Sequence, residues 1–283
     1  MARAPVLGVW EGVGIVSSIA SLSKVTIAGL WKVFDGHGQQ KVYALKDVSL
    51  AIPTGQFVVI VGPSGCGKTT MLRIIAGLET PTAGEIVVQQ ADRNRPVNAM
   101  IFQEQSVFPW MTVQDNIEYG LRMRGVGKAE RAKIADYYIG KTGLSKFRRA
   151  YPHQLSGGMK QRVSVARAFA NDPEILLMDE PFAALDEQNK ILLQEELLRI
   201  WEETRKTVIF ITHSIDEAIV LGDRVVVMTA HPGRIKADVM VDFPRPRNVY
   251  ELRADPRFGQ LFYEIWGLLK DEVMEAKRRE GGA

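Results

Sequence analysis

One stretch of nine residues limits what this chain of 283 residues can fold into more than any other feature. It fits the pattern G-x-x-x-x-G-K-S/T without a mismatch, and it lies between an apolar run at 57–61 and a helical pattern at 71–78. Its residues are Gly62, Pro63, Ser64, Gly65, Cys66, Gly67, Lys68, Thr69 and Thr70. Glycines let backbone N–H groups turn toward a phosphate chain, and the N-terminus of a helix favours negative charge. The stretch therefore predicts a site for a nucleoside triphosphate, with Lys68 on the β- and γ-phosphates and the Thr69 hydroxyl on Mg²⁺.

The composition narrows the class of protein. Apolar residues make up 46% of the chain and charged residues 24%, as in an ordinary soluble globular protein. The net charge of +3 is too small to argue for nucleic acid or a basic membrane anchor, so no nucleic-acid partner is expected. The single cysteine excludes an internal disulfide, and no apolar run reaches the roughly 18 residues that a membrane span requires.

Short apolar segments alternate with helical ones along most of the chain. Residues 175–178, 208–211 and 225–228 are apolar and evenly separated, which is typical of parallel strands covered on both faces. Residues 24–62 contain β-rich runs, whereas the interval 104–170 has a helical texture. The sequence therefore predicts an α/β core with a β-rich N-terminal subdomain and an inserted helical subdomain at about 104–170.

The two ends of the chain carry different patterns. Residues 1–23 are apolar but interrupted by Glu11, and they lack the continuous core of a signal peptide, so we expect a poorly ordered extension. Residues 246–283 are expected to form a helical tail, in which Asp255 is the N-cap and Pro256 the first helical residue. The apolar positions 258, 261, 262, 265, 269 and 273 lie on one face of this helix. We expect that face to pack on its own domain.

Two acidic side chains follow the apolar run 175–178. A strand there would carry Asp179 and Glu180 to the C-terminal edge of the sheet, where ligands gather in α/β proteins. Asp179 suits the hydration shell of Mg²⁺, and Glu180 suits the orientation or deprotonation of an attacking water. An acidic pair after a strand also often marks a plain helix start, and the upstream phosphate loop favours the catalytic interpretation.

A second candidate phosphate site has the sequence Leu-Ser-Gly-Gly-Met-Lys-Gln-Arg at 155–162. Ser156, Gly157 and Gly158 at the head of a helix offer a hydroxyl and unobstructed backbone N–H groups. Because the chain has one phosphate loop, the second phosphate would come from another molecule. Two copies facing each other meet this need, each giving its helix tip to the other's nucleotide. The plain alternative is a glycine linker before an unrelated helix.

Taken together over about residues 24–245, these motifs resemble the ATP-binding subunit of an ABC (ATP-binding cassette) transporter. Residues 62–70 match the Walker A loop, and residues 155–161 match the signature motif, with Met159 where many relatives carry Gln or Glu. The resemblance implies a P-loop NTPase (RecA-like) core, ATP and Mg²⁺ as cofactors, and ATP hydrolysis.

Single residues match the same family. Asp179 and Glu180 match Walker B and the catalytic glutamate, and Asp186 matches the D-loop. Gln103 matches the Q-loop glutamine, which contacts Mg²⁺ and water, and His213 matches the switch histidine that contacts the γ-phosphate. The resemblance thus implies the catalytic residues Glu180, His213, Gln103 and Lys68 and the metal ligands Thr69, Gln103 and Asp179. It also implies that an aromatic ring stacks on adenine; Phe34 is the candidate by position and Tyr43 the alternative, because stacking requires only a flat ring.

The surroundings of the motifs indicate an importer. The segment 102–113 resembles the importer version of the region that receives a membrane subunit. Phe108, Pro109 and Trp110 suit a docking groove there. The alternative is that Phe108 and Trp110 fill the core of the helical subdomain. The closing segment 242–247 resembles the nitrate/sulfonate/taurine/bicarbonate importer branch.

The resemblance implies an ATP-hydrolysing subunit on the cytoplasmic face of the cell membrane. Its implied partners are a second copy of itself in the ATP-bound state, integral membrane permease subunits and, indirectly, an extracytoplasmic solute-binding protein. The alternative is a soluble ABC-type ATPase that acts as an assembly or nucleic-acid factor.

Overall fold

The computed structural model describes residues 23–36, 40–103 and 106–281. The extension expected at 1–23 lies outside these residues except for Ser23, which begins the first strand. The elements are β1 (Ser23–Asp35), β2 (Lys41–Pro53), β3 (Phe57–Val61), α2 (Lys68–Ile75), β4 (Ala83–Val88), β5 (Asn98–Ile101), α3 (Val113–Met123), α4 (Lys128–Lys141), η1 (Ser145–Phe147), η2 (Pro152–Gln154), α5 (Gly157–Ala170), β6 (Ile175–Asp179), α6 (Glu187–Thr204), β7 (Thr207–Thr212), α7 (Ile215–Leu221), β8 (Arg224–Met228), β9 (Ile235–Met240), α8 (Val249–Ala254) and α9 (Pro256–Gly281).

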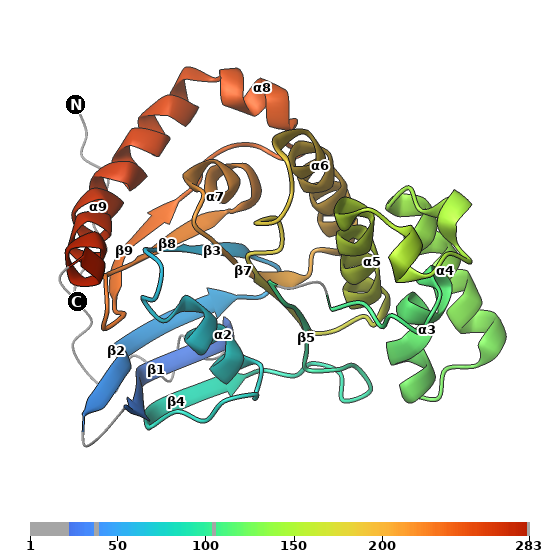
Figure 1. The fold of residues 1–283 in the computed structure, drawn as a ribbon, viewed down its shortest axis with the longest axis horizontal. Helices are drawn as coiled ribbons and strands as arrows, with labels where there is room; N and C mark the ends of the chain where they lie inside the picture. Colours follow the sequence, from blue (N-terminus) through green and yellow to red (C-terminus); the bar gives the residue numbers. More distant parts are fainter. Residues whose placement is uncertain (1–22, 37–39, 104–105, 282–283) are drawn as a thin grey trace.

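Two sheets form the framework (Figure 1). The larger sheet has the strand order β5-β6-β7-β3-β8-β9, in which every pairing is parallel except that of β8 with β9. The smaller sheet, β2-β1-β4, is antiparallel. This arrangement confirms the predicted α/β core, with a β-rich N-terminal part beside a mainly parallel sheet.

The apolar strands are buried because both faces of the larger sheet are covered. Successive residues of a strand point to opposite faces, and β3 divides accordingly. Val58 and Ile60 pack against α2 and the smaller sheet. Phe57, Val59 and Val61 pack on the other face, where α5, α6, α7 and α9 contribute the facing side chains. Full burial on two faces explains why these strands have no polar residue alternating with the apolar ones.

Helices α3, α4 and α5 occupy the interval in which the inserted subdomain is predicted, and they have a hydrophobic cluster of their own. In Figure 1 they lie at the side of the molecule opposite α9. Thr112 is the N-cap of α3, because its hydroxyl accepts a hydrogen bond from the Asp115 backbone N–H at 3.1 Å. The members of the cluster include Val113, Ile117, Ala135, Ile139, Val163 and Ala166.

Ser214 and Glu217 have the spacing of a capping box at the start of α7, but only half of that box forms. The Ser214 hydroxyl accepts a hydrogen bond from the Glu217 N–H at 3.3 Å. The Glu217 carboxylate, however, accepts a hydrogen bond from the Thr212 hydroxyl at 2.6 Å and does not bond to the Ser214 N–H. That N–H donates to Thr212 Oγ1 at 3.0 Å, so a neighbouring hydroxyl has replaced the carboxylate as its acceptor.

The C-terminal helix begins at Pro256 as expected, and it packs on its own domain. Phe258, Ile265 and Leu269 join the cluster beneath α6 and α7. Glu272 holds the helix to the turn before β9, because its carboxylate accepts hydrogen bonds from the Ala230 N–H and from Lys236 Nζ, both at 2.7 Å. Among the described helices, none combines the length and the apolar character needed to cross a membrane.

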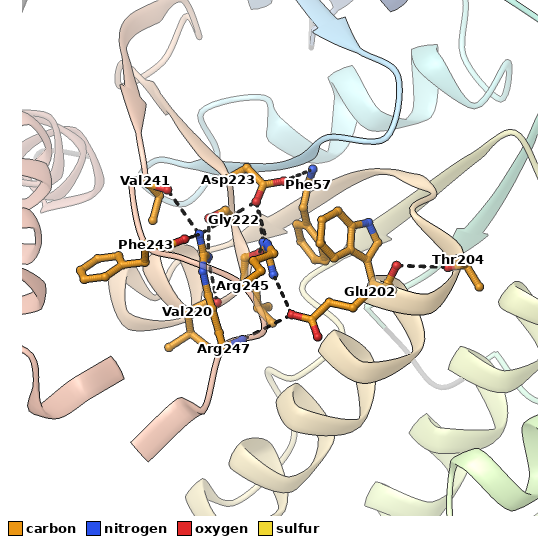
Figure 2. A network of polar contacts seen from close by, with 12 residues as sticks. Phe57, Glu202, Thr204, Val220, Gly222, Asp223, Val241, Phe243, Arg245 and Arg247 are labelled. Atoms are coloured by element: carbon orange, nitrogen blue, oxygen red, sulfur yellow. Dashed lines mark hydrogen bonds and ion pairs between the residues drawn. The ribbon is translucent and has the colours of Figure 1, made fainter. Parts of the chain in front are cut away.

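Two arginines join the segment before α8 to the end of α7 (Figure 2). The Arg247 side chain is 1% exposed, and burial lowers its pKa to about 10, so it remains charged at neutral pH. Arg245 pairs with Asp223 at 2.7 Å and lies over the Trp201 ring at 4.2 Å. The Arg247 guanidinium donates to the carbonyl oxygens of Ile219, Val220, Gly222, Val241 and Phe243. Arg247 thus satisfies the last carbonyls of α7, which a helix cannot satisfy itself.

We predict that Arg247→Met lowers the free energy of unfolding by about 3 kcal/mol, because it leaves several buried carbonyl groups without a donor. Urea unfolding followed by circular dichroism measures the change. Arg278→Met, at an exposed position near the end of α9, is the control and should change stability by less than about 0.5 kcal/mol. Equal losses in the two variants would contradict the role given to Arg247.

Candidate functional site

The phosphate loop joins the end of β3 to the start of α2. Gly67 has φ +100°, and a Cβ at this position would lie 2.6 Å from the Ala44 carbonyl oxygen, so no other residue fits there without displacement. Lys68 is buried, and its Nζ donates to the carbonyl oxygens of Gly62 and Pro63 at 2.8 and 2.9 Å. The ammonium group therefore lies along the inside of the loop, where a phosphate chain would replace its carbonyl partners.

A hydroxyl and a carboxylate meet beside the loop. Thr69 Oγ1 donates to Asp179 Oδ1 at 3.0 Å, and Asp179 is buried at the end of β6. Burial raises the pKa of Asp179, which makes a cationic partner favourable for its charged form. The described residues contain no group of three His, Cys, Asp or Glu side chains that could hold a metal ion by themselves. Two oxygen ligands fit Mg²⁺, which usually binds through one or two protein oxygens together with waters and substrate phosphates.

Glu180 and His213 face each other from neighbouring strand ends. Glu180 has φ +44°, a strained value for a residue other than glycine, and its N–H donates to the Ile211 carbonyl at 3.0 Å. Glu180 Oε2 lies 3.3 Å from His213 Nδ1. This contact lowers the pKa of the Glu180 carboxyl and raises the pKa of the His213 imidazole. Both groups are thereby stabilised in their charged forms.

The sheet topology brings these motifs to one edge. The strands β5, β6, β7 and β3 are adjacent and parallel, so their carboxyl ends lie on the same side. Gln103 follows β5, Asp179 ends β6, His213 follows β7 and the phosphate loop follows β3. Gln103 is exposed and has no hydrogen bond within the part of the chain that the structure describes.

The signature and D-loop residues lie next to each other. Ser156 caps α5 through the Met159 N–H at 3.3 Å, and Asp186 caps α6 through the Asn189 N–H at 3.0 Å. A Cβ on Gly158 would lie 3.7 Å from the Asn189 side chain. Over residues 23–36, 40–103 and 106–281, no hydrogen bond or ion pair joins 156–159 to the phosphate loop. The structure therefore does not bring the signature helix tip to the loop of the same chain.

The two candidate adenine-stacking rings lie on paired strands. Phe34 on β1 is opposite Val42, and Tyr43 on β2 is opposite Val33. Phe34 is 37% exposed and Tyr43 is 43% exposed, so both rings have a free face. Lys32 Nζ lies 4.7 Å from the centre of the Phe34 ring.

Phe108 and Trp110 lie at a groove, where the sequence predicts a docking site, but most residues that line this groove are not predicted from the sequence. The Phe108 ring is 4.6 Å from the Tyr119 ring, and the Arg167 guanidinium lies 5.0 Å from its centre. Trp110 is 70% exposed, so this ring does not fill the core. The groove has a volume of about 320 Å³, and its lining includes Met100, Phe108, Tyr119, Met123, Arg124 and Arg167. These residues come from β5, the loop before α3, α3 with its C-cap, and α5, and no local pattern connects them.

Comparison with known proteins gives one consistent result. A profile of the ABC transporter family matches residues 45–183. An uncharacterised ABC transporter ATP-binding protein of Methanocaldococcus jannaschii, MJ0412, is 48% identical over 255 residues, which cover 89% of this chain and 94% of that protein. The nitrate import ATP-binding protein NrtD of Synechocystis is 44% identical over 256 residues, covering 88% of this chain and 96% of that protein. The taurine import ATP-binding protein TauB of Roseobacter denitrificans is 39% identical, covering 90% and 98%.

A solved structure agrees with these relatives. It is the dimeric structure of a post-hydrolysis state of the ATP-binding cassette MJ0796 bound to ADP and Pi. It superimposes with a TM-score of 0.68 at 34% identity, covering 78% of this chain and all of that chain. The family profile, the relatives over most of their length and the shared fold together show that this chain belongs to the ATP-binding subunits of ABC transporters, which are ATPases.

Proposed function

We propose that this chain is the motor subunit of an importer, in which two copies bind two ATP·Mg²⁺ head to tail and couple hydrolysis to solute uptake. The observation that carries the proposal is the convergence of the phosphate loop, Asp179, Glu180 and His213 at one sheet edge. The relatives named for nitrate and taurine import support an anion of the nitrate/sulfonate/taurine/bicarbonate kind as the solute.

The residues at the sheet edge have separate roles in ATP hydrolysis. The loop N–H groups and Lys68 bind the β- and γ-phosphates once the ammonium leaves its carbonyl partners. Thr69, Asp179 and Gln103 would hold Mg²⁺, which neutralises charge on the phosphates when it is bound. Glu180 orients the attacking water and accepts its proton, and His213 contacts the γ-phosphate. The contact between Glu180 and His213 at 3.3 Å is exchanged for these new partners.

The second copy completes each site. The tip of α5 presents Ser156 and backbone N–H groups that contact no phosphate loop within the described part of this chain. A facing copy places this tip on the γ-phosphate bound to its partner. Asp186 and Asn189 lie beside Gly158, so the D-loop enters the same interface.

A permease subunit is the proposed occupant of the groove beside α3 and α5. Trp110 is exposed next to apolar and cationic lining residues, the composition that dominates interface hot spots. Gln103 lies a few residues before Phe108, so a partner bound there contacts the chain close to the nucleotide edge. This arrangement supports a peripheral position on the cytoplasmic face of the membrane.

We predict that Glu180→Gln nearly abolishes turnover while ATP is still bound. A general base contributes about 10²- to 10⁴-fold, so kcat should fall at least about a hundredfold, with the ATP dissociation constant within about threefold of the wild-type value. Steady-state hydrolysis and binding of a fluorescent ATP analogue measure the two quantities. Glu264→Gln, an exposed carboxylate of α9, is the control. Turnover within a few-fold of wild type would remove Glu180 from this role.

We predict that two inactive variants restore activity when they are mixed. Lys68→Ala removes the phosphate contact, and Gly158→Asp places a negative charge at the signature tip. In a mixed dimer both defects fall on one site, and the other site keeps an intact loop and an intact tip. Hydrolysis should therefore exceed the sum of the two parents. Gly259→Asp, on an open face of α9, should keep wild-type activity by itself. A mixture no more active than its parents would contradict the composite site.

We predict that Trp110→Ala weakens capture of the membrane partner. Truncating an interface hot spot typically costs about 2 kcal/mol or more, so recovery of integral membrane protein with the tagged chain from gently solubilised native membranes should fall markedly. Trp266→Ala, on an exposed face of α9, is the matched control and should not change recovery. Recovery of the wild-type chain from the soluble fraction alone, with ribosome or nucleic acid attached, would contradict the importer proposal.

A further inference from the structure

The carboxylate of Glu217 lies directly behind the proposed switch histidine. It is 4% exposed, and its two oxygens have partners on different elements. Oε2 accepts a hydrogen bond from the Thr212 hydroxyl at 2.6 Å. Oε1 lies 3.4 Å from Lys190 Nζ. One buried carboxylate therefore joins the end of β7, the first turn of α7 and the first turn of α6.

The start of α7 does not require this carboxylate. The Ser214 N–H, which a capping glutamate would satisfy, already donates to Thr212 Oγ1 at 3.0 Å. Burial raises the pKa of the Glu217 carboxyl, so the charged form is held against a desolvation cost. A buried ion pair is weak evidence for a purely stabilising role, because apolar replacements of similar volume are often as stable.

The two partners of Glu217 belong to two different motifs. Thr212 is the residue before His213, and it also fixes the following turn by accepting the Ser214 N–H. Lys190 lies one helical turn after Asp186, and its N–H donates to the Asp186 carbonyl at 2.9 Å. Glu217 thus connects the D-loop end of α6 to the turn that carries the histidine.

We propose that Glu217 is a positioning residue for hydrolysis, which fixes the His213 turn through Thr212 and ties it to the D-loop through Lys190. When a second copy displaces the D-loop, the ion pair transmits the displacement to the histidine and moves it away from Glu180. This inference rests on the proposed role of His213. It adds that the facing copy affects the position of the His213 imidazole through Lys190 and Glu217, which belong to the same chain as the histidine.

Three charged groups surround the His213 imidazole. Glu180 from the turn after β6 and Glu217 from α7 both raise its pKa, and Lys190 from α6 lowers it. Removing the Glu217 charge should therefore lower the pKa of His213, and removing the Lys190 charge should raise it. Opposite shifts of the His213 pKa in the two variants are a result that a general loss of packing would not produce.

The test uses the full chain with Glu217→Gln, Lys190→Met and the double variant. Glutamine keeps an acceptor for Thr212 but loses the attraction to Lys190. Each single variant should lower kcat by about tenfold with KM for ATP within about twofold, because the His213 turn is then no longer tied to the D-loop while the phosphate loop is intact. The double variant should be no slower than the slower single variant. The matched control breaks the ion pair Lys141–Glu203, which joins α4 to the other end of α6 at 2.5 Å, and this change should leave kcat unchanged.

The histidine is measured directly by NMR titration of its ring protons in the same variants. Opposite pKa shifts together with non-additive losses in kcat would support the proposal. Wild-type kcat in Glu217→Gln, additive losses in the double variant, or pKa shifts in the same direction would each overturn it. The variant His213→Ala distinguishes a failure of this inference from a failure of the proposed function. If His213→Ala loses turnover while Glu217→Gln keeps the wild-type kcat, the inference alone is rejected. Full turnover in His213→Ala would reject the switch role on which both proposals depend.

Discussion

The hydrogen-bonded pairing of the parallel strands β6, β7 and β3 sets the positions of all the motifs at the site. Asp179 lies opposite Ile211 in one pairing, and Val61 lies opposite Thr212 in the next. Because the strands share one polarity, the phosphate loop, the acidic pair and the His213 turn leave the sheet at the same level. A shift of one residue would turn every side chain of a strand to the other face, so this register determines which acids face the nucleotide edge.

Charged groups at this edge already have partners that a nucleotide complex would replace. Lys68 donates to carbonyls of its own loop, Asp179 accepts from Thr69, and Glu180 pairs with His213. These contacts hold the groups close to where phosphates, metal and water would bind in the proposed complex. In the proposed mechanism, the chemistry is a change of partners among groups that are already in place.

Residues of the C-terminal segment contact the elements that carry the site. Arg247 satisfies the last carbonyls of α7, and the first turn of that helix follows His213 directly. Glu272 of α9 holds the turn between β8 and β9. A Cβ at Gly233 in that turn would lie 2.0 Å from the Cys66 carbonyl oxygen, so the turn packs closely against the phosphate loop. The tail therefore contacts the structures that flank the site on two sides.

The class of fold and the ATPase family could be predicted from the sequence, because those signals lie in contiguous residues. The phosphate loop, the acidic pair after β6 and the helix starts at Thr112 and Pro256 all follow from local patterns. By contrast, the contacts of Glu217 with Thr212 and Lys190 depend on the folded structure, because the local capping rule would place this carboxylate on the Ser214 N–H. It also formed the groove beside Trp110 from β5, α3 and α5. Local rules act within about one helical turn, whereas these contacts exist only where the sheet brings distant segments together.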